Sequence, residues 1–300
     1  MTKTARSYQN VPDMTLDADT VVETFSCATD ENQISPLRQG QVIQLPAEGD
    51  VWLAGDIHDH RRNFEKFIKA ADLGNNPRRH VVFQELIHGD HYDANGAEDS
   101  WQMLHQAASL KCDHPHQVHF LMANHDLAQI HGEGIMKAGQ SVCEAFNAGI
   151  KRDFKGQRGT VQATITEFLL SLPLAIQCPN GLFFCHSLPA DDQMGAFDFG
   201  VFDRPVSGDD LRRRTGAVYQ LVWGRRTSPD VAALFADRVG AKLLVTGHQP
   251  QEGGYLTNGD RHLIIASEHN QGVFLTADLT AEYDMTKLVR SLRKFVSLDL

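Results

Sequence analysis

The sequence lacks an apolar run long enough to cross a membrane, and FLLSLPLAI, which is the nearest to one, is interrupted by Ser171 and Pro173. Its first residues, MTKTARSYQNVPDM, lack the apolar segment of a secretory signal. Internal repeats and low-complexity tracts are also absent. We therefore expect a soluble cytoplasmic protein that does not bind membranes.

Basic residues are too few for a general nucleic-acid-binding surface. The chain has 28 Lys and Arg residues against 38 Asp and Glu, a formal net charge of −10 and a pI near 5.8. A protein that binds nucleic-acid polymers needs a basic face to displace counterions from phosphates. An enzyme that acts on phosphate remains compatible with this composition, because bound cations can reverse the local potential of an acidic site.

Cysteine is sparse, and no pair has the CxxC spacing of a metal-binding or redox motif. We expect free thiols, mostly buried, in a reducing compartment. The stretch CDHPHQVH at 112–119 resembles half of a zinc knuckle, but no second ligand pair follows, which favours a loop that leads into a strand. The five cysteines are Cys27, Cys112, Cys143, Cys178 and Cys185.

From residue 49 onward, short apolar runs alternate with amphipathic segments, which indicates one α/β domain with more than one sheet layer. Residues 1–48 are polar and weakly patterned, and we expect an irregular N-terminal extension packed on that domain. The predicted strands are 51–54, 80–83, 118–123, 174–178, 182–185, 243–246, 262–266 and 273–276. The predicted helices are 61–71, 100–110, 141–154, 161–172, 211–221, 229–239 and 284–295.

Polar side chains follow five of the predicted strands, at the edge where open α/β sheets place their sites. A single group of this kind is often part of a turn that ends a strand. Five successive strand ends that carry carboxylate, carboxamide or imidazole groups indicate one shared ligand cluster. In chain order the residues are Asp56 with His58, Glu85, Asn124 with His125 and Asp126, His186, and His248.

These segments, in this order, resemble the motifs of the calcineurin-like metallophosphoesterases, in their phosphoprotein-phosphatase branch. The family motifs are GDxHG, GDxxDRG, GNH(E/D), a strand-end histidine and GHxx; here they read GDIHD, FQELIHG, ANHD, FFCHSLP and TGHQP. The similarity spans about residues 51–277, and NHDLAQ also resembles the diadenosine-tetraphosphatase subgroup. The resemblance implies a layered β-sandwich flanked by helices, as a single domain over 49–300.

The resemblance further implies two divalent ions, about 3.5–4 Å apart, that clamp a phosphoryl group and activate a water molecule. Mixed oxygen and nitrogen ligands suit Mn, Fe or Zn, of which we expect Mn. By the family pattern, the first ion is bound by Asp56 and His58, the second by Asn124, His186 and His248, and both by a bridging Glu85.

Three further residues receive roles from the same resemblance. His125 would transfer a proton at the leaving oxygen or clamp the phosphate, because its ordinary pKa lies near neutrality. Asp126 would hold the His125 ring in the useful tautomer. LVWGRR resembles the W-x-R segment of the family, which makes Arg225 the phosphate-binding candidate, with Arg226 behind it. The alternative for these two is a surface arginine pair.

The second motif departs from the family pattern. Glu85 stands for the bridging aspartate, and Asp90 is its rival because GDHYDANG superficially spells GDxxD. We favour Glu85, since it lies at the strand end. The arginine of DRG is absent, with Gly89 in its place and His88 in that of the preceding aspartate. Arg61 or Arg62 could supply that contact.

Two glycines of the family motifs are also replaced, by Asp59 in the first motif and by Ala123 before Asn-His.

The predicted function is hydrolysis of phosphate esters, with phosphoproteins and dinucleoside polyphosphates as candidate substrates. A phosphodiesterase is an alternative, although Gly247 to Pro250 lacks the second histidine of GHxH. The alternative from another class is a degenerate member that binds metal or a phosphorylated partner without turnover.

Overall fold

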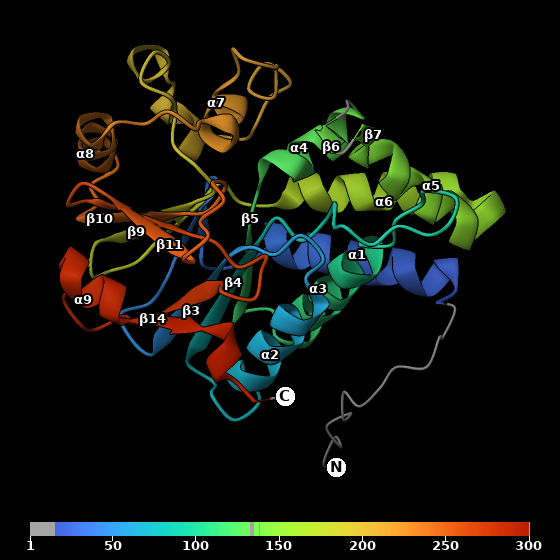
Figure 1. The fold of residues 1–300 in the computed structure, drawn as a ribbon, viewed down its shortest axis with the longest axis horizontal. Helices are drawn as coiled ribbons and strands as arrows, with labels where there is room; N and C mark the ends of the chain where they lie inside the picture. The colour runs from blue at the N-terminus through green and yellow to red at the C-terminus, as the bar shows by residue number, and fades with distance from the viewer. Residues whose placement is uncertain (1–15, 133–134, 138, 300) are drawn as a thin grey trace.

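Two β-sheets form the centre of the protein in the computed structural model, which describes residues 16–132, 135–137 and 139–299 (Figure 1). The five-stranded sheet has the order β14 (Leu292–Lys294), β13 (Val273–Asp278), β3 (Asp50–Asp56), β4 (Arg79–Gln84) and β5 (Val118–Leu121). The seven-stranded sheet has the order β1 (Arg38–Gln39), β2 (Val42–Gln44), β8 (Ala175–Gln177), β9 (Leu182–Cys185), β10 (Leu243–Thr246), β12 (His262–Ile265) and β11 (Tyr255–Asn258). A short hairpin pairs β6 (Met136–Lys137) with β7 (Gln140–Ser141).

Helices flank the sheets, with α1, α5 and α6 on the opposite side of the molecule from α8 and α9 (Figure 1). None of the helices in the described ranges is both long and apolar enough to cross a membrane. The α-helices are α1 (Ala18–Gln33), α2 (Arg61–Ala71), α3 (Trp101–Asp113), α4 (Asn124–His131), α5 (Val142–Phe154), α6 (Arg158–Ser171), α7 (Ala217–Trp223), α8 (Pro229–Arg238) and α9 (Met285–Arg290). Short 3-10 helices are η1 (Lys155–Gln157), η2 (Met194–Ala196), η3 (Phe199–Phe202) and η4 (Phe295–Ser297).

The core has an inner and an outer part. Apolar side chains of both sheets meet in the inner layer, for example Leu53 and Val82 of one sheet and Phe184 of the other. On the outer face of the five-stranded sheet, the Phe67 ring of α2 lies 5.3 Å from the rings of Phe83 and Phe274. This packing on both faces explains why the strands read as continuous apolar runs rather than alternating ones. The protein is therefore the layered, helix-flanked single domain that the sequence predicts.

Parallel pairing brings the functional strand ends to one region. β3, β4 and β5 are parallel to each other, as are β9, β10 and β12. A parallel bridge between Asp56 and Ala266 connects the two sheets at the end of β3. The carboxyl ends of β3, β4, β5, β9 and β10 can therefore contribute to one site.

The N-terminal segment contradicts the prediction of an irregular extension wherever it is described. Helix α1 spans Ala18–Gln33 and begins at Asp17, whose Oδ1 accepts a hydrogen bond from the amide of Thr20. Its Val21 and Phe25 are fully buried against the helical layer, and β2 pairs in parallel with β8. The division at residue 48 stays a prediction, and residues 1–15 lie outside the described ranges.

The predicted helix at 284–295 is also wrong in its second half. The helix ends at Arg290, and residues 292–294 form β14, which pairs antiparallel with β13. Phe295 then enters the core, with its ring 5.0 Å from that of Phe274. Edge pairing and this aromatic contact override the local helical pattern. Helix α7 begins at Ala217 rather than at the predicted residue 211.

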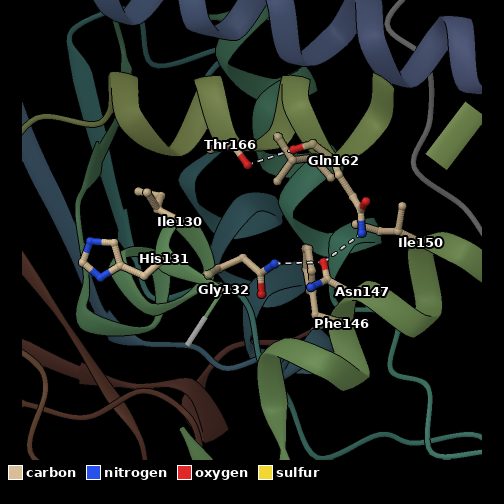
Figure 2. Close-up of a pocket in the computed structure, with 10 residues that line it drawn as sticks. Ile130, His131, Gly132, Phe146, Asn147, Ile150, Gln162 and Thr166 are labelled. Carbon is tan, nitrogen blue, oxygen red and sulfur yellow. Dashed lines mark hydrogen bonds between the residues drawn. The ribbon is translucent and has the colours of Figure 1, made fainter. Parts of the chain in front are cut away.

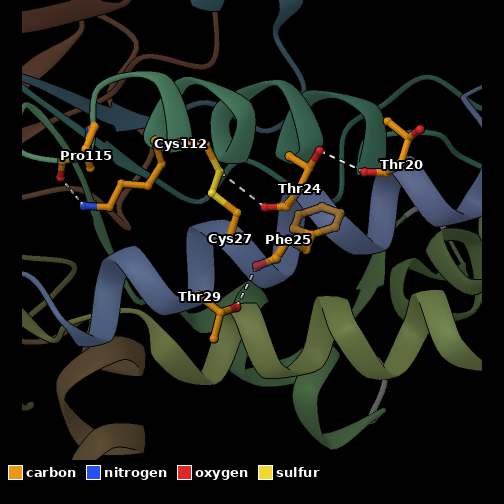
Figure 3. Close-up of a disulfide and its surroundings, with 8 residues drawn as sticks. Thr20, Thr24, Phe25, Cys27, Thr29, Cys112 and Pro115 are labelled. Atoms are coloured by element: carbon orange, nitrogen blue, oxygen red, sulfur yellow. Dashed lines mark hydrogen bonds between the residues drawn. A yellow bond between two sulfur atoms is a disulfide. The ribbon is translucent and has the colours of Figure 1, made fainter.

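The prediction that all five cysteines are thiols is wrong for two of them. Cys27 of α1 and Cys112 of α3 form a disulfide with a Cα–Cα distance of 6.2 Å (Figure 3). Cys112 belongs to a helix that continues to Asp113, not to the predicted loop. Cys143, Cys178 and Cys185 are buried thiols. Because Cys27 lies in the segment read as irregular, the sequence offered no reason to place it beside Cys112.

The disulfide predicts a stability difference between oxidised and reduced protein. It connects residues 85 positions apart, and such a cross-link typically adds about 2–4 kcal/mol by restricting the unfolded chain. Replacing Cys27 and Cys112 together by serine should lower the free energy of urea unfolding by that amount. The wild type treated with dithiothreitol should match the double variant. Equal stability of the untreated and reduced wild type, together with two more titratable thiols than expected, would contradict the disulfide.

Candidate metal centre

The candidate site lies where five strand ends meet. Asp56 is the last residue of β3, and Glu85 directly follows β4. Asn124 is the first residue of α4, which starts shortly after β5 ends. His186 directly follows β9, and His248 comes two residues after β10. All five side chains are buried, so the site is part of the folded core rather than of a surface loop.

One half of the site consists of Asn124, His186, His248 and Glu85. The Asn124 Oδ1 lies 2.8 Å from both His186 Nε2 and His248 Nδ1. A Glu85 carboxylate oxygen, Oε2, lies 3.4 Å from the same His186 nitrogen. Glu85, His186 and His248 can each direct one ligand atom to a common point. These four residues are among the ligands predicted from the sequence.

The other half shares Glu85 and adds two histidines. His58 Nε2 lies 3.8 Å from Glu85 Oε2, and His125 Nε2 lies 3.7 Å from Glu85 Oε1. These three residues form a second group that could hold an ion. The two groups share one carboxylate, which is the arrangement expected of a ligand that bridges two ions.

Asp56 approaches the shared carboxylate from β3. Its Oδ1 accepts a hydrogen bond of 2.9 Å from the His248 amide and lies 3.7 Å from His186 Nδ1. Gly247 makes this approach possible, because a Cβ there would lie 2.3 Å from that oxygen. The Asp56 and Glu85 carboxyl groups also contact each other.

The backbone is strained around this cluster. His58, Glu85, His88 and His248 all have φ between 45° and 67°, a region that residues other than glycine seldom adopt. Asp59, which replaces a family glycine, also has a positive φ of 56°. Aspartate tolerates this conformation better than most residues, so the glycine-requiring turn survives the replacement. Strain of this kind needs support from the surrounding fold.

Burial dominates the electrostatics of the site. It raises the pKa of Asp56 to about 7 and that of Glu85 well above its ordinary value, and the neighbouring Asp56 carboxyl raises the pKa of Glu85 further. Burial also lowers the pKa of His58 to about 4 and that of His248 to about 3. The imidazoles are therefore neutral at physiological pH, which is the form that binds metal ions.

The donor set fits divalent cations. Two carboxylates in contact and several neutral imidazole rings converge here, and few of their oxygen and nitrogen atoms carry a proton that could be donated to the others. The Asn124 Nδ2 is buried without a hydrogen-bond partner in the described part of the chain, while Asn124 Oδ1 sits between two ring nitrogens. Side chains that present oxygen and nitrogen lone pairs to a common point need a cation to be stable there.

Two other sequence candidates make contacts outside the centre. The Asp90 side chain is 73% exposed and pairs with Lys137 at 2.5 Å, so the geometry favours Glu85 over Asp90 as the shared carboxylate. Arg61 pairs with Asp59 and Asp99 at the rim. Neither contact involves the buried cluster.

Asp126 does not hold the His125 ring as predicted. Its Oδ2 accepts a 2.9 Å hydrogen bond from the Ala123 amide and caps the start of α4. The ring contact of His125 is instead with His88, whose Nδ1 lies 3.0 Å from His125 Nδ1. The tendency of an acidic side chain to bond the backbone at a helix start explains the difference.

Arg225 reaches the centre from the segment after α7. Its Nε donates a 3.2 Å hydrogen bond to His248 Nε2, and its guanidinium acts to lower the pKa of Asp56, although burial of that carboxyl prevails. The residue itself is largely exposed. Among the predicted site residues, Arg225 is thus the cationic side chain that contacts the cluster and is also open to solvent.

Sequence reasoning missed two buried partners of the ligands. Gln84 Oε1 lies 2.8 Å from His186 Nδ1, and its Nε2 donates to the carbonyl of Ala54. His88 was considered only as a replacement for a family aspartate, not as a partner of His125. Both belong to the motif FQELIHG, where a polar residue at the last position of an apolar strand could have indicated Gln84.

Comparison with known proteins agrees with this geometry. The sequence model of the calcineurin-like phosphoesterases matches residues 49–252. The chain belongs to the calcineurin-like phosphoesterase family. Phosphoesterases of this family use a dinuclear metal centre, and the two groups that share Glu85 are this chain's candidate for it.

Individual relatives are distant. A protein serine/threonine phosphatase of Saccharomyces cerevisiae superposes with a TM-score of 0.64 at 15% identity, covering 87% of this chain and 82% of that one. A cold-active protein-tyrosine phosphatase of a Shewanella species gives 0.53 at 13% identity, covering 84% and 80%. A probable serine/threonine-protein phosphatase of Encephalitozoon cuniculi is 23% identical over 283 residues, which are 84% of this chain and 53% of that protein. The chain thus spans about half the length of this curated relative, and the solved structures support the fold alone.

A buried carboxyl beside the site predicts a pH-dependent stability. Burial raises the pKa of Glu98 to about 7, although its oxygens accept hydrogen bonds from the amide and hydroxyl of Ser100. The folded protein holds this proton more tightly than the unfolded chain does. The free energy of unfolding should therefore fall by up to about 3 kcal/mol as the pH rises from about 4.5 to about 7.

Urea unfolding of Glu98→Gln across this pH range tests the prediction. The free energy of unfolding of the variant should not show this fall of up to about 3 kcal/mol. Above pH 7 the variant should therefore gain stability relative to the wild type. Glu65→Gln, which changes an exposed carboxyl, is the matched control and should retain the wild-type decline. Parallel curves for the wild type and Glu98→Gln would contradict the assignment.

Proposed function

We propose that this protein is a metal-dependent phosphatase that hydrolyses phosphate monoesters. The observation that carries the proposal is the pair of ligand groups that share Glu85, namely His58–Glu85–His125 and Glu85–His186–His248. Family membership supports ester hydrolysis in general, and this geometry supports a dinuclear centre in this chain. Of these residues, His58, Glu85, His186 and His248 are proposed ligands together with Asp56 and Asn124. His125, whose Nε2 lies 3.7 Å from Glu85 Oε1, is proposed to transfer a proton rather than to bind an ion.

Two divalent ions, with Mn as the first choice, would supply Lewis acidity that offsets phosphate charge and makes water nucleophilic. The side chains of this protein perform the remaining tasks. Arg225, exposed on one side and bonded to His248 on the other, is placed to bind phosphate oxygens with its planar guanidinium. His125 Nε2 faces the shared carboxylate and is the proposed atom for proton transfer at the leaving oxygen.

The proposed substrates are phosphorylated proteins, because the three similar proteins named above are described as protein phosphatases. Dinucleoside polyphosphates remain a second candidate on sequence grounds alone. Release of phosphate from a phosphoserine peptide, diadenosine tetraphosphate and p-nitrophenyl phosphate, each with added Mn²⁺, separates them. Preferential cleavage of bis-p-nitrophenyl phosphate would indicate the phosphodiesterase alternative, and binding of Mn²⁺ without any turnover would indicate the degenerate one.

Metal content tests the shared carboxylate. Wild-type protein equilibrated with Mn²⁺ should bind about two ions per chain and unfold at a higher temperature than protein treated with a chelator, because the ions bind the folded state. Glu85→Gln should bind one ion or none. Asp90→Asn, which changes the exposed rival, should retain both. Loss of metal from Asp90→Asn but not from Glu85→Gln would reverse the assignment.

His125→Ala tests the proton-transfer role. The variant should retain the metal content of the wild type and lose about 10²–10⁴-fold in kcat with p-nitrophenyl phosphate, the usual contribution of a positioned acid or base. His91→Ala, which removes an exposed histidine outside the site, should behave as the wild type. If His125→Ala loses one ion as well as turnover, His125 is a ligand and the proposed role is wrong.

A further inference from the structure

A chain of buried polar contacts leads from His125 away from the metal centre. His125 Nδ1 lies 3.0 Å from His88 Nδ1, and His88 Nε2 lies 3.0 Å from Gln129 Oε1. Gln129 Nε2 then donates a 3.1 Å hydrogen bond to Asn147 Oδ1, which also accepts one of 3.0 Å from Gln162 Nε2. These contacts connect the site to helices α4, α5 and α6.

The direction of these hydrogen bonds fixes where the protons lie. The two glutamine amide nitrogens face Asn147, so the Gln129 oxygen faces His88. An amide oxygen can only accept, so His88 carries its proton on Nε2 and has a lone pair on Nδ1. That lone pair accepts the Nδ1 proton of His125. A neutral His125 therefore presents the lone pair of its Nε2 to Glu85 and the metal centre.

His88 is held rigidly enough to impose this choice. Its side chain is fully buried, and its ring packs edge-on against Phe146 at 5.7 Å. Its amide donates a 3.0 Å hydrogen bond to the Ser100 hydroxyl, which is itself bonded to Glu98. Its backbone has a φ of 64°. A ring fixed at its backbone, at its face and at both nitrogens has one orientation.

The far end of the chain lines a cavity of about 240 Å³ between α4, α5 and α6. Asn147 and Gln162, which line it, are joined by a hydrogen bond (Figure 2). The amides that orient Gln129, those of Asn147 and Gln162, are partly exposed, whereas His88 is fully buried. Every group in this series of contacts, from His88 to Asn147, is neutral. In the described residues no carboxylate contacts the His88 ring or the Nδ1 side of the His125 ring.

We propose that His88 is a positioning residue that, with Gln129, holds His125 in the Nδ1–H tautomer and thereby aims the bare Nε2 at the reacting groups. This neutral pair of residues takes the place that the resemblance assigned to Asp126. The tautomer follows from the orientation of the Gln129 amide, whereas its effect on turnover rests on the proposed phosphatase function. Nε2 is then the atom of His125 that can take up a proton and pass it to the leaving oxygen.

Nuclear magnetic resonance of metal-free protein labelled with ¹⁵N-histidine tests the tautomer without any assay of activity. Long-range ¹H–¹⁵N correlations should show His125 protonated on Nδ1 in the wild type, assigned by comparison with His125→Ala. In Gln129→Leu, which removes the acceptor for His88, the His125 ring should shift to a mixture of tautomers. An Nε2–H tautomer in the wild type, or no change in Gln129→Leu, would overturn the proposal.

Kinetics with p-nitrophenyl phosphate and Mn²⁺ test the consequence. His88→Ala should lower kcat about 10–100-fold, the usual effect of removing a hydrogen-bond partner that orients a residue of a metal site, with KM and bound Mn²⁺ unchanged. His88→Asn, which restores an acceptor near the position of Nδ1, should recover part of kcat. Gln129→Glu keeps an acceptor for His88, so its kcat should be higher than that of Gln129→Leu. His131→Ala, on the exposed side of the same helix, is the matched control.

The outcomes separate the two proposals. If the wild type releases no phosphate, the proposed function fails while the tautomer measurement still stands. If the wild type is active and folded His88→Ala and Gln129→Leu retain full kcat, the positioning role is wrong. Thermal unfolding of each variant shows whether it is folded, and Gln129→Leu carries the test if His88→Ala is not.

Discussion

The buried carboxylate of Glu85 is the constraint around which the site is built. It lies in the core at the junction of two sheets, in contact with Asp56 and within 4 Å of His58, His125 and His186. A carboxylate in such a place is costly unless a proton or a cation accompanies it. The surrounding imidazoles are kept neutral by the same burial and cannot supply that charge as ion-pair partners. Because the imidazoles around the two buried carboxylates are neutral, the site favours metal ions as the positive partners of those carboxylates.

The fold supports this arrangement by holding backbone in conformations that isolated residues avoid. His58, Glu85 and His248 each follow the end of a strand and each has a positive φ. Parallel pairing of β3 with β4 and of β9 with β10 anchors these turns on their amino-terminal side. On the other side, the Ile57 and His58 amides both bond to the Glu85 carbonyl. The strands therefore fix the positions of the ligands, and loop backbone bonded to loop backbone fixes their directions.

The sequence allowed the strand-end residues of the candidate site to be picked out because each of them is adjacent in the chain to its strand. Asp56, Glu85 and His186 each lie at a boundary where apolar residues give way to polar ones, so local pattern was sufficient. Helix α1 was missed because its apolar face is narrow and its burial comes from α3 and α6, which are distant in sequence. The contacts of His88 with His125 and Gln129 were missed for the same reason. A residue's orientation within a motif depends on neighbours that its own segment does not contain.

The two replacements in the second family motif compensate each other in formal charge. The family's DRG segment carries an aspartate and an arginine side by side, and this chain has His88 and Gly89 there. One negative and one positive group are lost together, so the net charge around the centre is conserved. His88 is buried and neutral, because burial lowers its pKa to about 3, and it contacts His125 without adding a carboxylate to a site that already holds two. Arg225, bonded to His248 at the exposed rim, is the cation that we propose for phosphate binding.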